Sequence, residues 1–376
     1  MIRDLADMTG ASSRRSGLAT TLLAAALAAA VCATARAGDA VPRAEPWKVS
    51  GKLYGEPDKD RPGDFAASDK ADDVSGIACA TASGFPRVCL VADDEAQGAQ
   101  IVILRDGSLR AGSFIRLIDA AHDGVPLELD AEGVAYADGA FYVIGSHGRP
   151  RRAAGKPEAG TVARAEATRH LFRIRFDPSA VDPETGVLAG KPEIAEMGAL
   201  ARLIREDPVL KLFHDRPLEE GGVTVEGVAV RDGRLHVGFR GPVLQGGDAV
   251  MLSVSLDGLF GGEPSAATVT RLALGRDSHG TARGVRDLAA VPEGFLILAG
   301  PMLDPKGDGV EPGDYAIFRW TGTDAPVQAL ALDGYGRKVK PEALLPLDRT
   351  GDRLRALVLF DGPKEGAPRT VEIPLR

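Results

Sequence analysis

The chain has few of the features that identify a particular chemistry. It contains only three cysteines in 376 residues, and the two that follow the N-terminal apolar run cannot complete a metal site by themselves. It has no HExxH or paired CxxC sequence, no P-loop and no dinucleotide-binding fingerprint. Basic residues are also in deficit, since 45 Lys and Arg face 53 Asp and Glu and leave a formal charge of −8. This balance disfavours nucleic acid as a partner and allows cation binding.

Long apolar runs are lacking except near the N-terminus. An alanine- and leucine-rich run, Gly17 to Ala35, follows Arg14 and Arg15 and ends in a small-x-small cleavage site before Gly38. We predict that residues 1–37 are a signal peptide and that the mature chain is periplasmic or secreted. An uncleaved anchor is the alternative. The Sec route is favoured over the twin-arginine route because the arginine pair lacks the usual aromatic residue after it. No membrane span is expected after cleavage.

A hairpin-like unit recurs along the rest of the chain. Its clearest copies run from Asp130 to Arg149 and from Thr224 to Pro242, as DAEGVAYADGAFYVIGSHGR and TVEGVAVRDGRLHVGFRGP. Weaker copies begin at Ser75, Arg286 and Glu342. Each copy is an apolar run, a turn and a second apolar run, which is typical of a β-hairpin. The copies are roughly 57, 94, 60 and 56 residues apart, a spacing that suits four-stranded propeller blades.

This period predicts an all-β fold: one five-bladed β-propeller over residues 38–376, with a sixth blade possible only in the longest interval. The last unit lacks an outer strand, so we expect Trp47 to Tyr54 to join the last blade and close the ring. The longest interval carries an insertion at about residues 150–222. Within it, Arg149 to Arg169 is expected to be a long loop, and Leu200, Leu203 and Ile204 show the spacing of a short helix. Decoration of the ring is favoured over a lid.

Two cysteines flank the turn of the first hairpin. Cys79 and Cys89 would lie on paired strands of an exported protein, so we predict a disulfide between them. Two buried free thiols are the alternative.

Charged residues recur at one position of the unit. Glu132, Glu226, Arg286 and Glu342 share this column with Ser75, at the start of each innermost strand. Because these strands line the central channel, the column should converge at one mouth, where the second strands also end at Asp93-Asp94 and Ser146-His147. The mouth candidates beside the column are Asp130, His147, Arg149, Arg240, Arg283, Asp287 and Asp361.

Converging carboxylates need positive charge among them. One possibility is Ca²⁺ bound by Glu132, Glu226 and Glu342. Another is internal pairing of these glutamates with the arginines of the mouth, and a third is a ligand site without a cation. The neighbouring Ser146 and His147 do not suggest a catalytic dyad, because adjacent strand residues point to opposite faces.

These motifs resemble a known family. DVSGIACA with VCLVADDEAQ, the two clear copies, GVRDLAAVPEGFLILAGP, and KPEALLPL with LVLFDG resemble the bacterial family DUF3616, whose members are expected to be exported propellers. More loosely, the EGVA hairpins are similar to phytase-like esterase-repeat propellers and calcium-dependent apyrases. That similarity implies ring acids, here Glu132, Glu226 and Glu342, that hold calcium for phosphate substrates. Arg286 and Ser75 depart from the acidic pattern of the column.

Two functions follow from this sequence. The favoured one is a binding module whose acidic and arginine-lined mouth takes a small anionic ligand or a protein. The alternative is a calcium-dependent hydrolase of phosphate esters or anhydrides, in which Glu132 or Glu226 would activate water while Arg240 or Arg286 holds the anion. No nucleophile–base pair is evident in the sequence, which favours binding.

Overall fold

The computed structural model describes residues 44–61, 63–150, 158–261, 266–304 and 309–376. The predicted signal peptide therefore lies outside the described residues. Within these ranges, none of the helices is long and apolar enough to cross a membrane.

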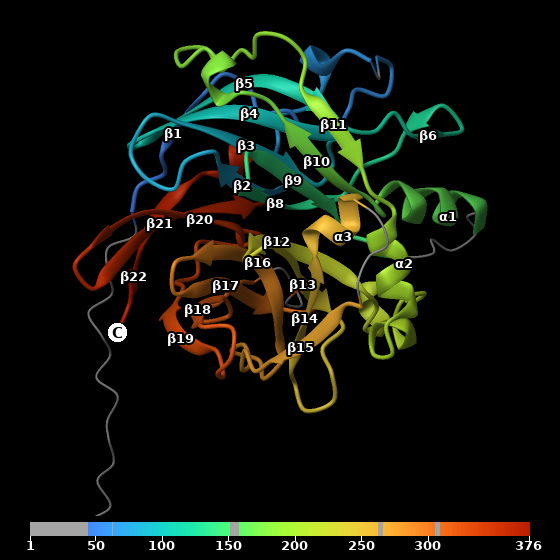
Figure 1. Ribbon diagram of the computed structural model, residues 1–376, viewed down its shortest axis with the longest axis vertical. Helices are drawn as coiled ribbons and strands as arrows, with labels where there is room; N and C mark the ends of the chain where they lie inside the picture. The colour runs from blue at the N-terminus through green and yellow to red at the C-terminus, as the bar shows by residue number, and fades with distance from the viewer. Residues whose placement is uncertain (1–43, 62, 151–157, 262–265, 305–308) are drawn as a thin grey trace, which may run out of the picture. The chain divides into compact units, whose positions relative to one another are not determined.

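Five antiparallel hairpin units follow one another and form the predicted five-bladed propeller (Figure 1). Blade 1 holds β2 (Val74–Cys79), β3 (Arg87–Asp93), β4 (Gly98–Arg105) and β5 (Ser108–Arg116), and blade 2 holds β8 (Ala131–Ala137), β9 (Ala140–Gly145), β10 (Leu171–Arg175) and β11 (Glu193–Glu196). Blade 3 holds β12 (Thr224–Arg231), β13 (Arg234–Gly241), β14 (Ala249–Ser255) and β15 (Thr268–Leu272), and blade 4 holds β16 (Arg283–Val291), β17 (Gly294–Pro301), β18 (Ala316–Trp320) and β19 (Val327–Ala331). Blade 5 has three strands, β20 (Lys340–Thr350), β21 (Arg353–Asp361) and β22 (Arg369–Pro374).

The core lies between blades rather than inside them. The buried apolar residues form five clusters, one for each pair of neighbouring blades, including the seam between the last blade and the first. The first strand of every blade packs against the first strands of its two neighbours, and β2 meets β20. Because a hairpin cannot bury both of its faces alone, each blade is stabilised by its neighbours, and the circle leaves none of them at an open end.

The ring closes differently from the sequence-based prediction. The N-terminal strand β1 (Lys48–Ser50) pairs in parallel with β5, at the outer edge of blade 1, and blade 5 stays three-stranded. The predicted pairing with the last blade is therefore wrong. Trp47 explains the difference, since its side chain packs into the cluster between blades 5 and 1 while its backbone N–H donates to the Pro368 carbonyl at 2.6 Å. The segment fills the seam, and no described strand pairs with the outer edge of β22.

The insertion in blade 2 contains two helices. The predicted helix is confirmed as α2 (Ala199–Glu206), whose Leu200 and Ile204 are buried. The loop predicted over residues 149–169 is wrong in part, because residues 158–167 form α1 (Glu158–Ala167), while residues 151–157 of that prediction lie outside the described residues. This helix buries small residues, Thr161 and Ala165, at helical spacing. Small side chains carry little hydrophobic signal, so the pattern did not indicate a helix.

Three smaller features complete the fold. The predicted disulfide is confirmed, since Cys79 and Cys89 are bonded at directly opposite positions of β2 and β3. A short ribbon, β6 (Ala121–His122) and β7 (Val125–Pro126), connects blades 1 and 2. A final helix, α3 (Leu256–Gly261), follows β14.

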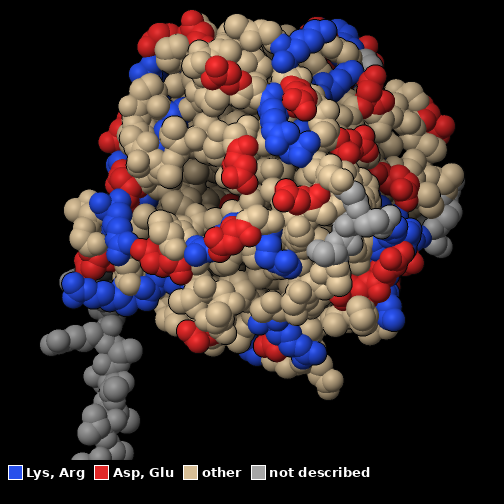
Figure 2. Space-filling model, viewed as in Figure 1, with Lys and Arg blue, Asp and Glu red and all other residues tan. Residues whose placement is uncertain are grey.

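On the face shown in Figure 2, acidic and basic side chains are interspersed rather than gathered by sign.

Candidate functional site

A β-bulge lies at the same position of every blade, and its extra residue is the one singled out by the sequence. In every pairing of a first strand with its second strand, the residue of this column is skipped: Ser75, Glu132, Glu226, Arg286 and Glu342. A bulged residue leaves the ladder and turns its side chain away from the regular alternation. The five bulges therefore place the charged column at the channel mouth as a feature of the backbone.

Glycine beside the bulge lets the inner strands approach one another. A Cβ on Gly76 would lie 2.8 Å from the backbone nitrogen of Val134, and one on Gly227 would lie 2.9 Å from that of Leu288. Backbone hydrogen bonds also link the turns around the mouth. The Asp130 N–H donates to the Asp94 carbonyl at 2.9 Å, and the Ser146 N–H donates to the Asp130 carbonyl at 2.8 Å. The rim positions of blades 1 and 2 are thus held together through main-chain atoms.

One half of the mouth is neutralised internally. Arg286, 1% exposed, lies between two column glutamates: its Nε is 3.0 Å from Glu226 Oε2, and it makes a two-pronged contact with Glu342. Arg240 binds the other oxygen of Glu226 at 2.9 Å and Asp304 at 2.7 Å. Burial alone would lower the pKa of Arg286, but Glu226 and Glu342 raise it well above its ordinary value. This half is a fixed arginine–carboxylate network.

The other half has no such partner. One carboxylate oxygen each from Asp94, Asp130 and Glu132 lies within 4.8 Å of the others. No described lysine or arginine forms an ion pair with any of the three. Asp94 Oδ1 is buried without a hydrogen-bond partner in the described structure, whereas Asp130 accepts a hydrogen bond from Ser146 Oγ. Three carboxylates held together in this way are suited to a hard cation such as Ca²⁺.

The predicted metal ligands are thus divided between the two halves. The carboxylate of Glu132 lies close enough to those of Glu226 and Glu342 to interact with them, so the expected convergence occurs. Glu226 and Glu342, however, belong to the arginine network, and the carboxylates available for a cation beside Glu132 are Asp94 and Asp130. Arg286 separates the sets, because it is the column residue that supplies positive charge to its two neighbours.

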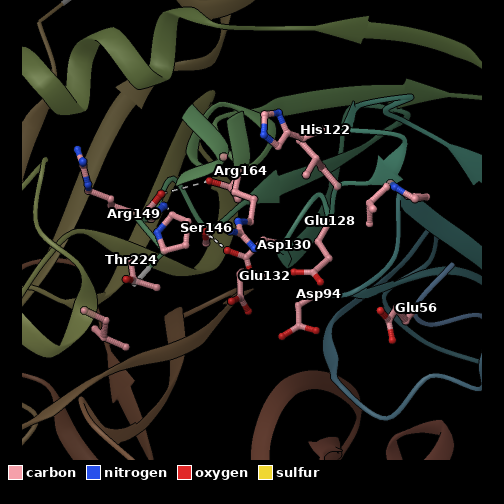
Figure 3. A pocket seen from close by; sticks show the side chains of 18 of the residues that line it. Glu56, Asp94, His122, Glu128, Asp130, Glu132, Ser146, Arg149, Arg164 and Thr224 are labelled. Carbon is pink, nitrogen blue, oxygen red and sulfur yellow. Dashed lines mark hydrogen bonds between the residues drawn. The ribbon is translucent and has the colours of Figure 1, made fainter. Parts of the chain in front are cut away.

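The unpaired carboxylates open into a cavity of about 750 Å³. Figure 3 shows Asp94, Asp130 and Glu132 facing a common space, with Glu128 beside them. The cavity is also lined by the basic residues Lys59, Arg149, Arg164 and Arg240 and by residues of the insertion, Gly160, Leu218 and Glu219. The insertion therefore forms part of the wall. Glu128 and Arg164 were not among the predicted residues, because neither belongs to the repeat.

Burial and mutual repulsion perturb these acids. Burial raises the pKa of Asp94 well above its ordinary value, and Glu132 and Asp93 add to the shift. Burial and then Glu226 and Asp130 do the same for the pKa of Glu132. Burial raises the pKa of Asp130 to about 6, although its hydrogen bond from Ser146 opposes the shift, and raises the pKa of Glu128 to about 7. Burial and mutual repulsion thus make the charged forms of these carboxylates unfavourable, and a bound cation would offset that free-energy cost.

Two rim residues have a left-handed backbone. Asp130 has φ 54° and His147 has φ 53°, a conformation that is unfavourable for residues other than glycine and that concentrates at functional sites. His147 is 2% exposed, and neither of its ring nitrogens has a hydrogen-bond partner in the described structure. Burial lowers its pKa to about 3, so the imidazole is neutral. His147 is not among the residues that line the cavity.

The remaining predicted residues have other roles. Arg283 donates to the carbonyls of Leu274, Gly313 and Asp314, and it supports loops rather than the mouth. Asp287 accepts from the N–H of Leu344 at 2.7 Å, which ties β16 to β20.

Asp361 pairs with Lys340 at 2.6 Å beside the arginine network. Arg149 lines the cavity, and its Nη1 lies 4.0 Å from Asp215. A second acidic group, Asp72, Asp73 and Glu95, is also compact, but Lys364 pairs with Asp72 at 2.6 Å. Asp94, Asp130 and Glu132 are therefore the better candidate for a cation.

The fold and the mouth together define a five-bladed propeller with a half-neutralised acidic channel mouth. The chain belongs to the family described as "Protein of unknown function (DUF3616)", whose profile matches residues 85–371. This confirms the resemblance read from the motifs. No curated protein matches the chain in sequence.

Solved structures resemble the fold only distantly. The PQQ-bound aldose sugar dehydrogenase from Streptomyces coelicolor is 16% identical, covers 81% of this chain and 94% of its own, and has a TM-score of 0.36. The calcium-binding protein regucalcin from Agrobacterium tumefaciens is 13% identical, with 88% and 97% covered and a TM-score of 0.35. An N-acetylgalactosamine deacetylase from F. plautii is 11% identical, with 88% and 94% covered and a TM-score of 0.39. These similarities are too low to carry a functional argument.

Proposed function

We propose that this protein is a ligand-binding propeller that takes up a divalent cation, calcium by preference, at its channel mouth. One observation carries the proposal. Asp94, Asp130 and Glu132 bring three carboxylates together at a cavity, and no described lysine or arginine forms an ion pair with them, whereas the neighbouring Glu226 and Glu342 both form ion pairs with arginine. If this acidic cluster had only a structural role, we would expect its carboxylates to form ion pairs with arginine as well.

The donor set favours calcium over transition metals. All three groups are carboxylates, and Ca²⁺ accepts six to eight oxygen ligands in flexible geometry. The cluster includes no histidine or cysteine, the ligands that zinc and copper prefer. The orphaned Asp94 Oδ1 supplies an acceptor that lacks a donor in the described structure. A bound cation would satisfy that oxygen and reduce the repulsion that raises the pKa of Asp94 and Glu132.

The ligand we infer beyond the cation is a small anion. Lys59, Arg149, Arg164 and Arg240 line the same cavity as the acidic cluster, so an anion bound to the cation would also meet basic side chains. The cavity volume is within the usual range for small-molecule sites. A carboxylate on the loop of a partner protein could present an anionic group to the same site. Measuring whether small anions compete for the site would distinguish a small-molecule ligand from a protein ligand.

Export is part of the proposal. The apolar N-terminal run and its cleavage site support secretion or a periplasmic location, with the Sec route preferred. The Cys79–Cys89 disulfide supports an oxidising compartment. Extracellular calcium-binding modules typically have dissociation constants of about 0.1–1 mM. A site of three carboxylates could work at such weak affinity.

Hydrolysis of a phosphate ester or anhydride is the second candidate. It is supported by Asp130 and Glu128, whose pKa values of about 6 and 7 are near neutrality in the same cavity, as a general base or acid requires. The binding function is preferred because the Ser146 hydroxyl beside these acids is hydrogen-bonded to the Asp130 carboxylate rather than to an imidazole.

Calorimetric titration with CaCl₂ after EDTA treatment tests the proposal. We expect one calcium per chain and a rise in Tm, with both effects lost in Asp94→Asn. Glu372→Gln, an exposed change on β22, is the control and should bind calcium as the parent does. Equal calcium binding by Asp94→Asn and the parent would refute the assignment. A phosphatase and lactonase panel on the calcium-loaded protein then separates binding from hydrolysis.

A further inference from the structure

A second cavity lies at the other end of the inner strands. It measures about 530 Å³ and is lined by the second halves of β2, β8, β12, β16 and β20 and the turns that follow them. It shares no lining residue with the acidic mouth. The buried ion pairs of Arg286 involve the column glutamates, which precede the lining residues of this second cavity along each inner strand. The channel therefore offers two separate sites.

Small side chains create this second cavity. Three residues after the charged column, four blades carry alanine and the fifth carries leucine, and all five residues line the cavity: Ala78, Ala135, Ala229, Ala289 and Leu345. Close approach of the inner strands accounts for the glycines beside the bulge, but it does not account for these alanines, because space remains in front of them. The repeat thus places a ring of methyl groups around an open apolar volume.

The rest of the wall combines buried apolar residues with a rim that carries charged side chains. Ile77, Val134, Val228 and Leu344 line the cavity and are at most 4% exposed. The two carboxylates of the rim are each paired with arginine, Glu293 with Arg349 and Asp348 with Arg355. The remaining rim cation, Arg87, has a different environment.

Arg87 is 1% exposed, and within the described structure it forms no ion pair. Its guanidinium donates to the carbonyls of Gly84, Pro346 and Leu347. These bonds use three of its five N–H groups. The guanidinium also lies 5.0 Å from the centroid of the Phe85 ring. A buried guanidinium that forms no ion pair is costly, and it places positive charge at the edge of the apolar volume.

We propose that this second cavity binds a small amphipathic carboxylate, a free medium-chain monoanion whose apolar body lies among the alanines and whose carboxylate pairs with Arg87. The alkyl chain of the ligand would remove the apolar lining from water. Its carboxylate would form the ion pair that Arg87 lacks among the described residues. The volume is within the range of small-molecule pockets. This site is independent of calcium and of the acidic mouth.

Fluorescence titration with 8-anilinonaphthalene-1-sulfonate, an apolar body with one anionic group, tests the proposal. We expect saturable binding of one probe per chain, displaced by decanoate at about tenfold lower concentration than by decanol, since a charged hydrogen bond is worth about 1.5–3 kcal/mol. Ala229→Leu should weaken probe binding about tenfold or more, because its added carbons occupy the cavity.

Ala331→Leu is the matched control, since it makes the same change on an exposed position of β19, and it should bind the probe as the parent does. Circular dichroism establishes that each variant is folded. If Ala229→Leu does not fold, the smaller Ala289→Val takes its place. Absence of saturable binding, or unchanged binding in the folded cavity variant, would overturn the site. Equal displacement by decanol and decanoate would overturn the assignment to a carboxylate.

Discussion

The residue at the bulge of each blade sets the charge of the channel mouth. Four of the five positions are charged, and the arginine of blade 4 takes the two glutamates beside it into an ion-paired network. No described arginine forms an ion pair with Glu132, which groups with Asp94 and Asp130 instead. A single residue therefore divides a symmetric-looking ring into a structural half and an open half.

Arg286 should be among the least replaceable residues of the chain. Arg286→Met removes the cation between Glu226 and Glu342, which leaves Glu342 buried without its arginine partner and Glu226 paired with Arg240 alone. Loss of one partner of a buried pair costs about 3–5 kcal/mol, so we expect a loss of that size in the free energy of unfolding measured by urea denaturation. Arg355→Met, at a partly exposed pair with Asp348, should cost about 0–1 kcal/mol. Equal losses would contradict the structural role given to the network.

The acidic half should make stability depend on pH. Burial raises the pKa of Asp130 to about 6 and of Glu128 to about 7, so the folded protein holds protons that the unfolded chain releases from about pH 4 upward. The free energy of unfolding contributed by these groups therefore falls as pH rises from about 4 to 7. Urea denaturation in EDTA at three pH values should show the fall, and calcium should reduce it. An Asp130→Asn profile as steep as the parent's would exclude Asp130 as a source.

At the scale of the strand, the bulge and the following glycine act together. The bulge turns the column residue toward the channel, and the missing Cβ lets the next blade's first strand lie close. Gly76→Ala would set a Cβ 2.8 Å from the backbone of blade 2. We expect a loss of about 1–3 kcal/mol, typical of overpacking, measured by chemical denaturation. Gly63→Ala, where a Cβ meets nothing within 4 Å, should have little effect, and a similar loss there would argue against a packing cause.

The sequence predicted the strands and the column because both repeat. It did not predict the bulges, because the inner strands are buried on both faces and show no two-residue alternation in which an extra residue would be visible, nor α1, whose buried face consists of small residues. Asp94 and Asp130 were placed at the mouth, but their grouping with Glu132 depends on which carboxylates Arg240 and Arg286 reach. Which carboxylates these arginines reach depends on how side chains of neighbouring blades contact one another in space. The spacing of residues along the sequence gives no information about those contacts.

At the scale of the whole molecule, the seam between the first and last blades is the feature that the repeat could not specify. Every other pair of neighbouring blades is joined by a continuous chain, whereas blades 5 and 1 are joined by packing of β2 on β20 and by the N-terminal segment. Trp47 lies in that seam, 8% exposed, and its backbone bonds to blade 5 while β1 pairs with blade 1. This residue thus connects both sides of the closure.

Trp47→Ala should therefore weaken the closure as well as the core. Loss of a buried tryptophan side chain costs about 3–5 kcal/mol, and we expect hydrogen exchange to accelerate at the amides of β5 and β22 that flank the seam. Trp320→Ala removes a tryptophan that is 6% exposed between blades 3 and 4, so it should lower stability comparably while native-state exchange at β5 and β22 stays slow. If both variants loosen β5 and β22 alike under native conditions, the ring opens as one unit and the seam has no special weakness. If only Trp47→Ala does, the N-terminal segment is the element that closes the propeller.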